Sequence, residues 1–165
     1  ALLRTYGTGT GSYSGDGGAA TSATIRTPGQ LAIFGNQLYV ADMDNHVIRV
    51  INTDTGIINT YAGDYNFGDG RLATKNQLMR PNGITLNPTK NIVYIADTGT
   101  YTIRAWNRTS NTLKSFAGKV GVKNTVYKEG DGGQATSSTL RSPSSTCIDL
   151  ERNLLFISGN FNFNR

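Results

Sequence analysis

Three aspartates in this sequence lie in glycine-rich segments where they could hold a metal ion. Asp16, Asp69 and Asp131 are each preceded and followed by glycine. Oxygen ligands in such a loop suit a hard cation such as calcium, with Glu129 as a further ligand, although the spacing is not that of an EF-hand. A carboxylate between glycines can also accept the backbone N–H groups of a tight turn, while the glycines adopt positive φ. We expect the turn and no metal at all three positions, with calcium as the alternative.

Two further aspartates each end a stretch of residues typical of a strand. Arg49 follows Asp42 by seven residues, and Arg104 follows Asp97 by the same interval. If the next strand returns antiparallel, each aspartate and its arginine come close together. A hydrogen-bonded pair of this kind stabilises the end of a sheet. We therefore predict two structural ion pairs, Asp42–Arg49 and Asp97–Arg104, in preference to a ligand site, and expect removal of either arginine to destabilise the fold.

Residues for catalysis are scarce. The sequence has one histidine, His46, and one cysteine, Cys147, whose thiol we expect to be buried. Zinc requires three or four suitable ligands. The segment Gly11–Gly15 has the outline of a nucleophile elbow, but Tyr13 stands where the nucleophile would be. The glycine-rich start also lacks the Gly-Lys-Ser/Thr ending of a phosphate loop. The sequence predicts no catalytic residue, no cofactor and no zinc site.

One modification signal is present. Asn107-Arg108-Thr109 is an acceptable N-glycosylation sequon, whereas Asn87-Pro88-Thr89 is excluded by its proline. A glycan requires an exposed loop of a secreted protein. We therefore predict a glycan on Asn107 and an extracellular or cell-surface protein.

The composition describes one β-rich domain. The 165 residues include 20 glycines, and 37% are hydrophobic, which is enough to bury a core. The net charge of +5 is carried by scattered lysines and arginines, so nucleic-acid binding is not favoured. No apolar run approaches the roughly 18 residues of a membrane span.

The glycine–aspartate motif recurs together with the residues that follow it. An Ala-Thr pair and then a proline come after each copy, and an alternating apolar stretch follows each proline. Intervals of more than fifty residues exclude leucine-rich and hexapeptide solenoids. The three prolines are Pro28, Pro81 and Pro143.

Four short strand-like stretches, separated by Gly, Asn, Asp and Thr, make up each full repeat. This pattern predicts an all-β propeller with four-stranded antiparallel blades. About two and a half blades cannot close a ring of four to eight, so we expect a segment of a longer polypeptide, completed by further blades. The predicted parts are the outer strand of a preceding blade (1–7), blade 1 (8–63), blade 2 (64–118) and an incomplete blade 3 (119–165).

The stretches after the prolines, 30–33, 83–86 and 146–150, are expected to be the strands nearest the ring axis. Their apolar residues and those of the next strands should then pack between neighbouring sheets. The predicted core residues are Leu31, Ile33, Ile84, Leu86, Ile148, Val40, Ile95 and Ile157.

These motifs resemble NHL repeats. The resemblance rests on the run Gly9–Thr21, on Leu38–Asp42, and on Asn45-His46 with Val47 in place of the usual leucine. It covers nearly the whole chain and implies a six-bladed propeller. Blade 3 departs from the pattern, because Gly159 stands where the other two blades have aspartate.

Three functions follow from this reading. The favoured one is a non-catalytic module of a larger extracellular protein, which binds protein partners or copies of itself for adhesion, ligand binding or surface assembly. The alternative implied by the family is a metal-dependent lyase or hydrolase whose site is completed by other blades. The third is an RNA-binding propeller, which would bind in a strongly salt-dependent way.

Overall fold

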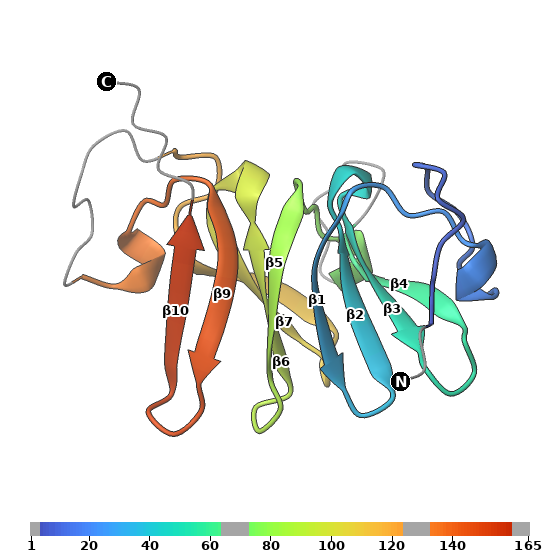
Figure 1. Ribbon diagram of the computed structural model, residues 1–165. Coiled ribbons are helices and arrows are strands. Elements are labelled where there is room, and N and C mark those ends of the chain that lie inside the picture. The colour runs from blue at the N-terminus through green and yellow to red at the C-terminus, as the bar shows by residue number, and fades with distance from the viewer. Residues whose placement is uncertain (1–3, 64–72, 124–132, 160–165) are drawn as a thin grey trace.

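The computed structural model describes residues 4–63, 73–123 and 133–159, and in these ranges the chain is an all-β protein (Figure 1). Two four-stranded antiparallel sheets and one two-stranded sheet follow one another, each with its strands in sequence order. The predicted fold class is confirmed: the sheets are propeller blades in an open part of a ring. Blade 1 contains β1 (Pro28–Phe34), β2 (Gln37–Asp42), β3 (Val47–Asn52) and β4 (Ile58–Ala62). Blade 2 contains β5 (Pro81–Asn87), β6 (Ile92–Asp97), β7 (Thr102–Asn107) and β8 (Thr112–Ala117). Blade 3 contains β9 (Pro143–Asp149) and β10 (Leu154–Gly159).

Short 3-10 turns connect these strands at equivalent places. Two of them lie between the second and third strands, where η2 and η4 each end at a residue in the left-handed conformation, His46 or Tyr101. The other three precede the first strands of the blades. The turns are η1 (Ala20–Ser22), η2 (Met43–Asn45), η3 (Ala73–Lys75), η4 (Thr98–Thr100) and η5 (Ala135–Ser137).

The first strands of the three blades lie side by side, with β5 between β1 and β9 (Figure 1). Gln30 of β1 joins all three blades, because its Oε1 accepts the Ile84 N–H at 3.0 Å and the Ser145 hydroxyl at 3.2 Å. Thr85 donates its hydroxyl to the Thr146 carbonyl at 2.6 Å. Polar side chains thus bind neighbouring blades to one another close to the ring axis.

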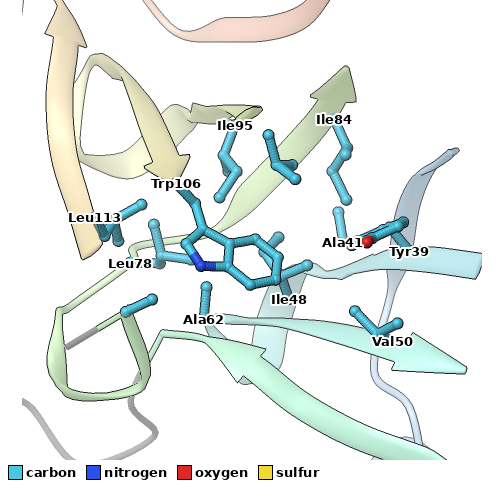
Figure 2. Packing of buried hydrophobic residues seen from close by; sticks show 12 residues of the cluster. Tyr39, Ala41, Ile48, Val50, Ala62, Leu78, Ile84, Ile95, Trp106 and Leu113 are labelled. Carbon is cyan, nitrogen blue, oxygen red and sulfur yellow. The ribbon is translucent and has the colours of Figure 1, made fainter. Parts of the chain in front are cut away.

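The largest apolar cluster fills the seam between blades 1 and 2 (Figure 2). Trp106 of blade 2 is 2% exposed and packs against the rings of Tyr39 and Tyr61 from blade 1, with centroids 6.1 and 5.9 Å apart. Ile84 and Ile95 are buried in this cluster as predicted. Of the other predicted core residues, Val40 is buried in a separate cluster, and Leu86 and Ile148 are partly buried.

The predicted burial is wrong for Leu31, Ile33 and Ile157, which are 55%, 64% and 37% exposed. Leu31 and Ile33 lie on the face of blade 1 that corresponds to the face of blade 2 packed against blade 1. No sheet in the described residues covers that face of blade 1. Ile157 lies on β10, which has no third strand beside it in the described part of blade 3. Alternation therefore identified the apolar face correctly but not whether another sheet covers it.

Residues 4–7, expected as an outer strand of a preceding blade, do not form a strand in the structure. A strand requires a neighbour with which to form a ladder. Here Gly7 instead donates its N–H to the Ala20 carbonyl at 2.9 Å, and Tyr6 packs against the buried cluster that contains Ala20. Residues 4–7 are therefore bound to the start of η1 instead of to a neighbouring strand.

Glycine is required where the outer strand leaves each full blade. Gly63 and Gly118 have φ of +86° and +84°. A Cβ on Gly63 would collide with the His46 carbonyl oxygen, and one on Gly118 would lie 2.5 Å from that of Tyr101. Both the positive φ and the close approach exclude a side chain.

Candidate functional site

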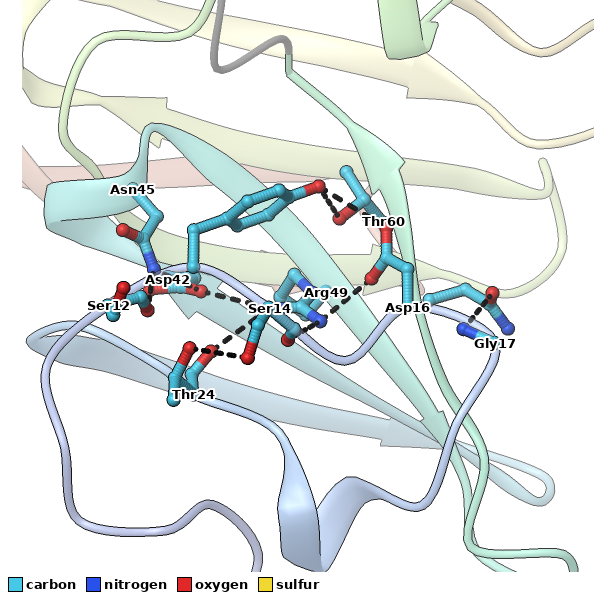
Figure 3. A network of polar contacts seen from close by, with 11 residues as sticks. Ser12, Ser14, Asp16, Gly17, Thr24, Asp42, Asn45, Arg49 and Thr60 are labelled. Atoms are coloured by element: carbon cyan, nitrogen blue, oxygen red, sulfur yellow. Dashed lines mark hydrogen bonds and ion pairs between the residues drawn. The ribbon is translucent and has the colours of Figure 1, made fainter.

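The predicted Asp42–Arg49 pair is at the centre of a polar network in blade 1 (Figure 3). The register of β2 and β3 places Val40 opposite Arg49, so the arginine side chain reaches the Asp42 end of the strand. Arg49 Nη1 lies 3.4 Å from Asp42 Oδ2, and both side chains are fully buried. Arg49 Nη2 also forms a shorter ion pair, 2.7 Å, with Asp16 Oδ1. The guanidinium thus bridges two carboxylates.

Asp42 is satisfied by more than its arginine. Asn45 Nδ2 donates to both carboxylate oxygens at 2.9 and 3.0 Å, and the Arg26 backbone N–H donates at 2.8 Å. Burial raises the pKa of Asp42, and the hydrogen bonds from Asn45 and Arg26 and the charge of Arg49 oppose that rise. The same Asn45 amide donates to the Ser12 carbonyl at 2.7 Å, which ties the loop before Asp16 to the end of β2.

Asp16, one of the three metal candidates, has a structural role in this network. Its carboxylate accepts Arg49 at 2.7 Å and the Tyr13 hydroxyl at 3.2 Å. This differs from the expected acceptance of backbone amides from its own turn. The following residue, Gly17, donates its N–H to the Ile58 carbonyl at 2.9 Å and to Asn59 Oδ1 at 3.1 Å. The loop is therefore bound to blade 1 on both sides of Asp16.

The other metal candidates, Asp69 and Asp131, lie outside the described residues, as does Glu129. Within the described ranges, no group of three or more His, Cys, Asp or Glu side chains is placed to hold a metal ion.

Blade 2 repeats the aspartate centre with different partners. Asp97 Oδ1 accepts the Met79 N–H at 2.6 Å, and Oδ2 accepts the Thr100 hydroxyl at 2.7 Å. Arg104 Nη1 lies 3.8 Å from Oδ2. Burial raises the pKa of Asp97 to about 6 in spite of these contacts.

The sequon asparagine lies at the end of β7, where it closes the turn into β8. Asn107 Oδ1 accepts the backbone N–H groups of Thr109 and Ser110 at 2.9 and 3.0 Å. Asn107 is half-buried, whereas Thr109 and Ser110 are exposed. Glycosylation takes place on Nδ2, an atom that the turn does not use. Asn52 forms the same turn in blade 1 with Asp54 and Thr55, but no sequon begins there.

His46 and Cys147 have no common site. His46 Nδ1 accepts the Arg80 N–H at 3.0 Å, which makes it a contact between blades 1 and 2. Cys147 is exposed on β9, contrary to the expected burial, because its face of blade 3 is not covered by another sheet in the described residues.

A pocket of about 480 Å³ opens where blades 1, 2 and 3 meet, beside the start of β5 and β9. We call it the Arg80 pocket. Basic side chains come from Arg80, Lys123 and Arg141, and the rest of the lining is supplied by Met43, Asn82, Thr98, Gly99 and Ser142. The pocket lies between η2, η4 and the segments that precede Pro81 and Pro143.

Backbone contacts fix the walls of this pocket. Gly99 donates its N–H to the Met79 carbonyl at 2.7 Å, and Gly121 donates to Thr100 at 3.0 Å. Lys123 forms a parallel bridge with Leu140. Arg80 Nε lies 3.3 Å from Asp44 Oδ1, with 57% of the Arg80 side chain exposed.

Sequence reasoning missed the Arg80 pocket because its basic residues are far apart in the chain. A signal was present: Arg26, Arg80 and Arg141 each lie one or two residues before a repeat proline. Only the stacking of blades shows that two of them share a pocket with Lys123.

A second pocket, of about 440 Å³, lies between Tyr39, Trp106 and Arg108. Its polar groups are largely bonded to one another. Arg108 Nη1 donates to the Tyr39 hydroxyl at 2.6 Å, and Trp106 Nε1 donates to Asn111 at 3.1 Å. The guanidinium also covers the Phe34 ring at 4.9 Å. This region therefore connects blades 1 and 2.

No family model matches the chain, but curated relatives do. NHL repeat-containing protein 2 of Gallus gallus is 27% identical over 131 residues, which cover 74% of this chain and 17% of the relative. The protein of that name from Bos taurus is 31% identical over 83 residues, or 49% of this chain and 11% of the relative. The matches thus span less than a fifth of these proteins. The predicted resemblance to NHL repeats is confirmed.

Solved structures share the fold. A Bacteroides thetaiotaomicron protein of unknown function superimposes with a TM-score of 0.65 at 21% identity, covering 79% of this chain and 33% of that one. An auxiliary nutrient binding protein of the same organism gives a TM-score of 0.59 at 20% identity, covering 77% and 33%. In the described residues, no helix is long and apolar enough to cross a membrane.

Proposed function

We propose that this chain, whose repeats are those of NHL-type β-propellers, is part of a non-catalytic interaction module of a larger extracellular protein. The observation that carries the proposal is the use made of the reactive side chains in blade 1. Asp16, Asp42 and Arg49 bond to one another and to the backbone. Asp42 and Arg49, whose side chains are fully buried, stabilise the blade in this way and are not available to a substrate.

The turn at Asn107 supports the extracellular part of the proposal. Its Oδ1 is bound by the turn, and the two following sequon positions are half-buried and exposed. The attachment of a sugar at Nδ2 would leave both turn hydrogen bonds in place. The nutrient-binding neighbour shares the fold and is consistent with a binding role.

The test is mass spectrometry of glycopeptides from the full-length protein isolated from its own source. We expect a glycan on Asn107, loss of that glycan in Asn107→Gln, and none on Asn52, which forms the same turn without a sequon. An unmodified Asn107 in protein from the native source would overturn the extracellular assignment. Turnover of a substrate by the purified protein, abolished by chelators, would instead support the metal-dependent enzyme.

A further inference from the structure

The Arg80 pocket has the charge of an anion-binding site. Three basic side chains from two blades and from the loop after β8 line it. Asp44, which forms an ion pair with Arg80, has a lowered pKa because of the hydrogen bond from Thr27 and the nearby charges of Arg80 and Arg26.

The remaining lining determines what kind of anion fits. Thr98 and Ser142 contribute hydroxyls, and Asn82 contributes an amide. No aromatic side chain belongs to the described lining, so the pocket offers no surface on which nucleobases could stack, as single-stranded RNA sites require. Hydroxyl and amide groups suit a ligand that is itself rich in hydroxyls.

Size and rigidity agree with a compact ligand. A volume of about 480 Å³ lies within the range of small-molecule sites. Thr98 donates its hydroxyl to the Pro143 carbonyl at 2.6 Å, which joins blade 2 to blade 3 at the pocket wall. Since contacts between blades already fix the walls, little ordering is needed on binding.

We propose that the Arg80 pocket binds an acidic saccharide, one or two sugar units carrying carboxylate or sulfate groups. This inference rests on the proposed function and names the ligand class of the module. The arginines bind the anionic groups, with forks that match a carboxylate or sulfate. The Ser142 hydroxyl and the Asn82 amide bind the sugar hydroxyls, and Thr98 Oγ1, whose proton goes to the Pro143 carbonyl, accepts from one of them. Asp44 competes with the ligand for Arg80.

The experiment is calorimetric titration of the full-length protein with four probes. They are a digalacturonate, a sulfated disaccharide, uncharged cellobiose and a ten-nucleotide RNA. We expect one or both acidic disaccharides to bind, more weakly as salt increases, and cellobiose not to bind. The two acidic probes distinguish carboxylate from sulfate recognition.

The variants locate the site. Lys123→Ala, Arg141→Ala and Arg80→Gln should each weaken binding about tenfold, the effect of losing one charged hydrogen bond. Asp44→Asn should tighten it several-fold. The matched control is Arg152→Ala, which removes an exposed arginine paired with Asp149 away from the pocket and should leave affinity unchanged. Thermal melts identify any variant that fails to fold. Because the Lys123 side chain is exposed, we expect Lys123→Ala to fold normally and to report on binding alone.

Failure of both acidic probes to bind, or binding unaffected by Lys123→Ala and Arg141→Ala, overturns the pocket assignment. RNA binding that exceeds disaccharide binding and depends on the same residues also overturns it. A glycosylated, inactive protein that binds no saccharide would disprove only this inference. If chromatography showed that the protein cleaves the bound disaccharide, the non-catalytic function would be disproved, but the assignment of the pocket as a saccharide site would stand.

Discussion

Blades 1 and 2 place an aspartate at the same point of the same sheet, yet they satisfy it differently. In blade 1, Asn45 gives an amide hydrogen bond to each oxygen of Asp42. In blade 2, Thr100 stands at the equivalent position and gives one hydroxyl bond to Asp97. The backbone therefore fixes where the charge is buried, while the residue three positions later determines how many hydrogen bonds the carboxylate receives from it.

The ion pair between aspartate and arginine is also shorter in blade 1 than in blade 2. Arg49 lies 3.4 Å from Asp42, whereas Arg104 lies 3.8 Å from Asp97. Arg49 also donates to the Ser14 carbonyl at 3.0 Å and so connects the Asp16 loop to the sheet. The corresponding Asp69 of blade 2 lies outside the described residues.

The largest effect is expected from Arg49→Ala. This change leaves the buried Asp42 without its cation and the Ser14 carbonyl without that donor, which should lower the free energy of unfolding by about 3–5 kcal/mol. Urea unfolding of the full-length protein measures it. Arg49→Lys retains the charge but not the fork and should lose less.

Arg104→Ala should also destabilise the protein, through Asp97. If unfolding of Arg49→Ala and Arg104→Ala both coincided with that of the parent, the predicted structural pairs would be disproved.

The second effect is a pH dependence that comes from Asp97. Its pKa is about 6 in the folded protein, against a normal value of 3.8. Between these values the folded state binds more protons than the unfolded state. Asp97 therefore contributes most stability below pH 3.8, and that contribution is lost as pH rises through 6.

Comparison with Asp97→Asn isolates this effect. Between pH 7 and pH 4 the parent should gain about 1–3 kcal/mol of unfolding free energy relative to the variant. Urea unfolding at several pH values measures the difference. A gain with the opposite sign would mean that Arg104 outweighs the burial of Asp97.

Exchanging Asn45 and Thr100, the residues three positions after each aspartate, tests the comparison directly. Asn45→Thr removes one of the two bonds to Asp42 and the bond to the Ser12 carbonyl, so it should cost about 1–2 kcal/mol. Thr100→Asn supplies a second donor near Asp97 and should lower the pKa of that carboxyl. Unfolding free energies and pH profiles of both variants measure these outcomes. If Asn45→Thr and Thr100→Asn changed the free energy of unfolding by the same amount, the residue at this position would not account for the difference between the blades.

The sequence predicted these centres because they depend on local register. In an antiparallel meander, residues seven apart across a short turn are neighbours, and repetition in two blades made the spacing of Asp42 and Arg49 conspicuous. The contact between Asp16 and Arg49 was missed because a loop 33 residues earlier in the chain must fold back onto the sheet. The spacing of residues along the sequence does not show which loop folds back onto a sheet.

The same limit explains the other departures. The exposure of Leu31 and Cys147 depends on which sheet faces have a neighbour, and the Arg80 pocket depends on the stacking of three blades. Alternation specifies two faces for each strand but not what packs against them.

The smallest effect is expected at Tyr13, which fixes the Asp16 loop in blade 1. Its hydroxyl lies 3.2 Å from Asp16 Oδ2 and 2.9 Å from Thr60 Oγ1, and its ring lies 5.0 Å from the guanidinium carbon of Arg49. Tyr13→Phe removes the hydroxyl contacts but keeps the ring beside the cation, and should cost about 0.5–1.5 kcal/mol. Tyr13→Leu also removes the cation–π contact and should cost about 0.5–1 kcal/mol more. Urea unfolding of both variants measures the two steps. If Tyr13→Phe has no effect while Arg49→Ala remains severe, the arginine alone holds the loop; if both are severe, the loop and the sheet of blade 1 fold as one cooperative unit.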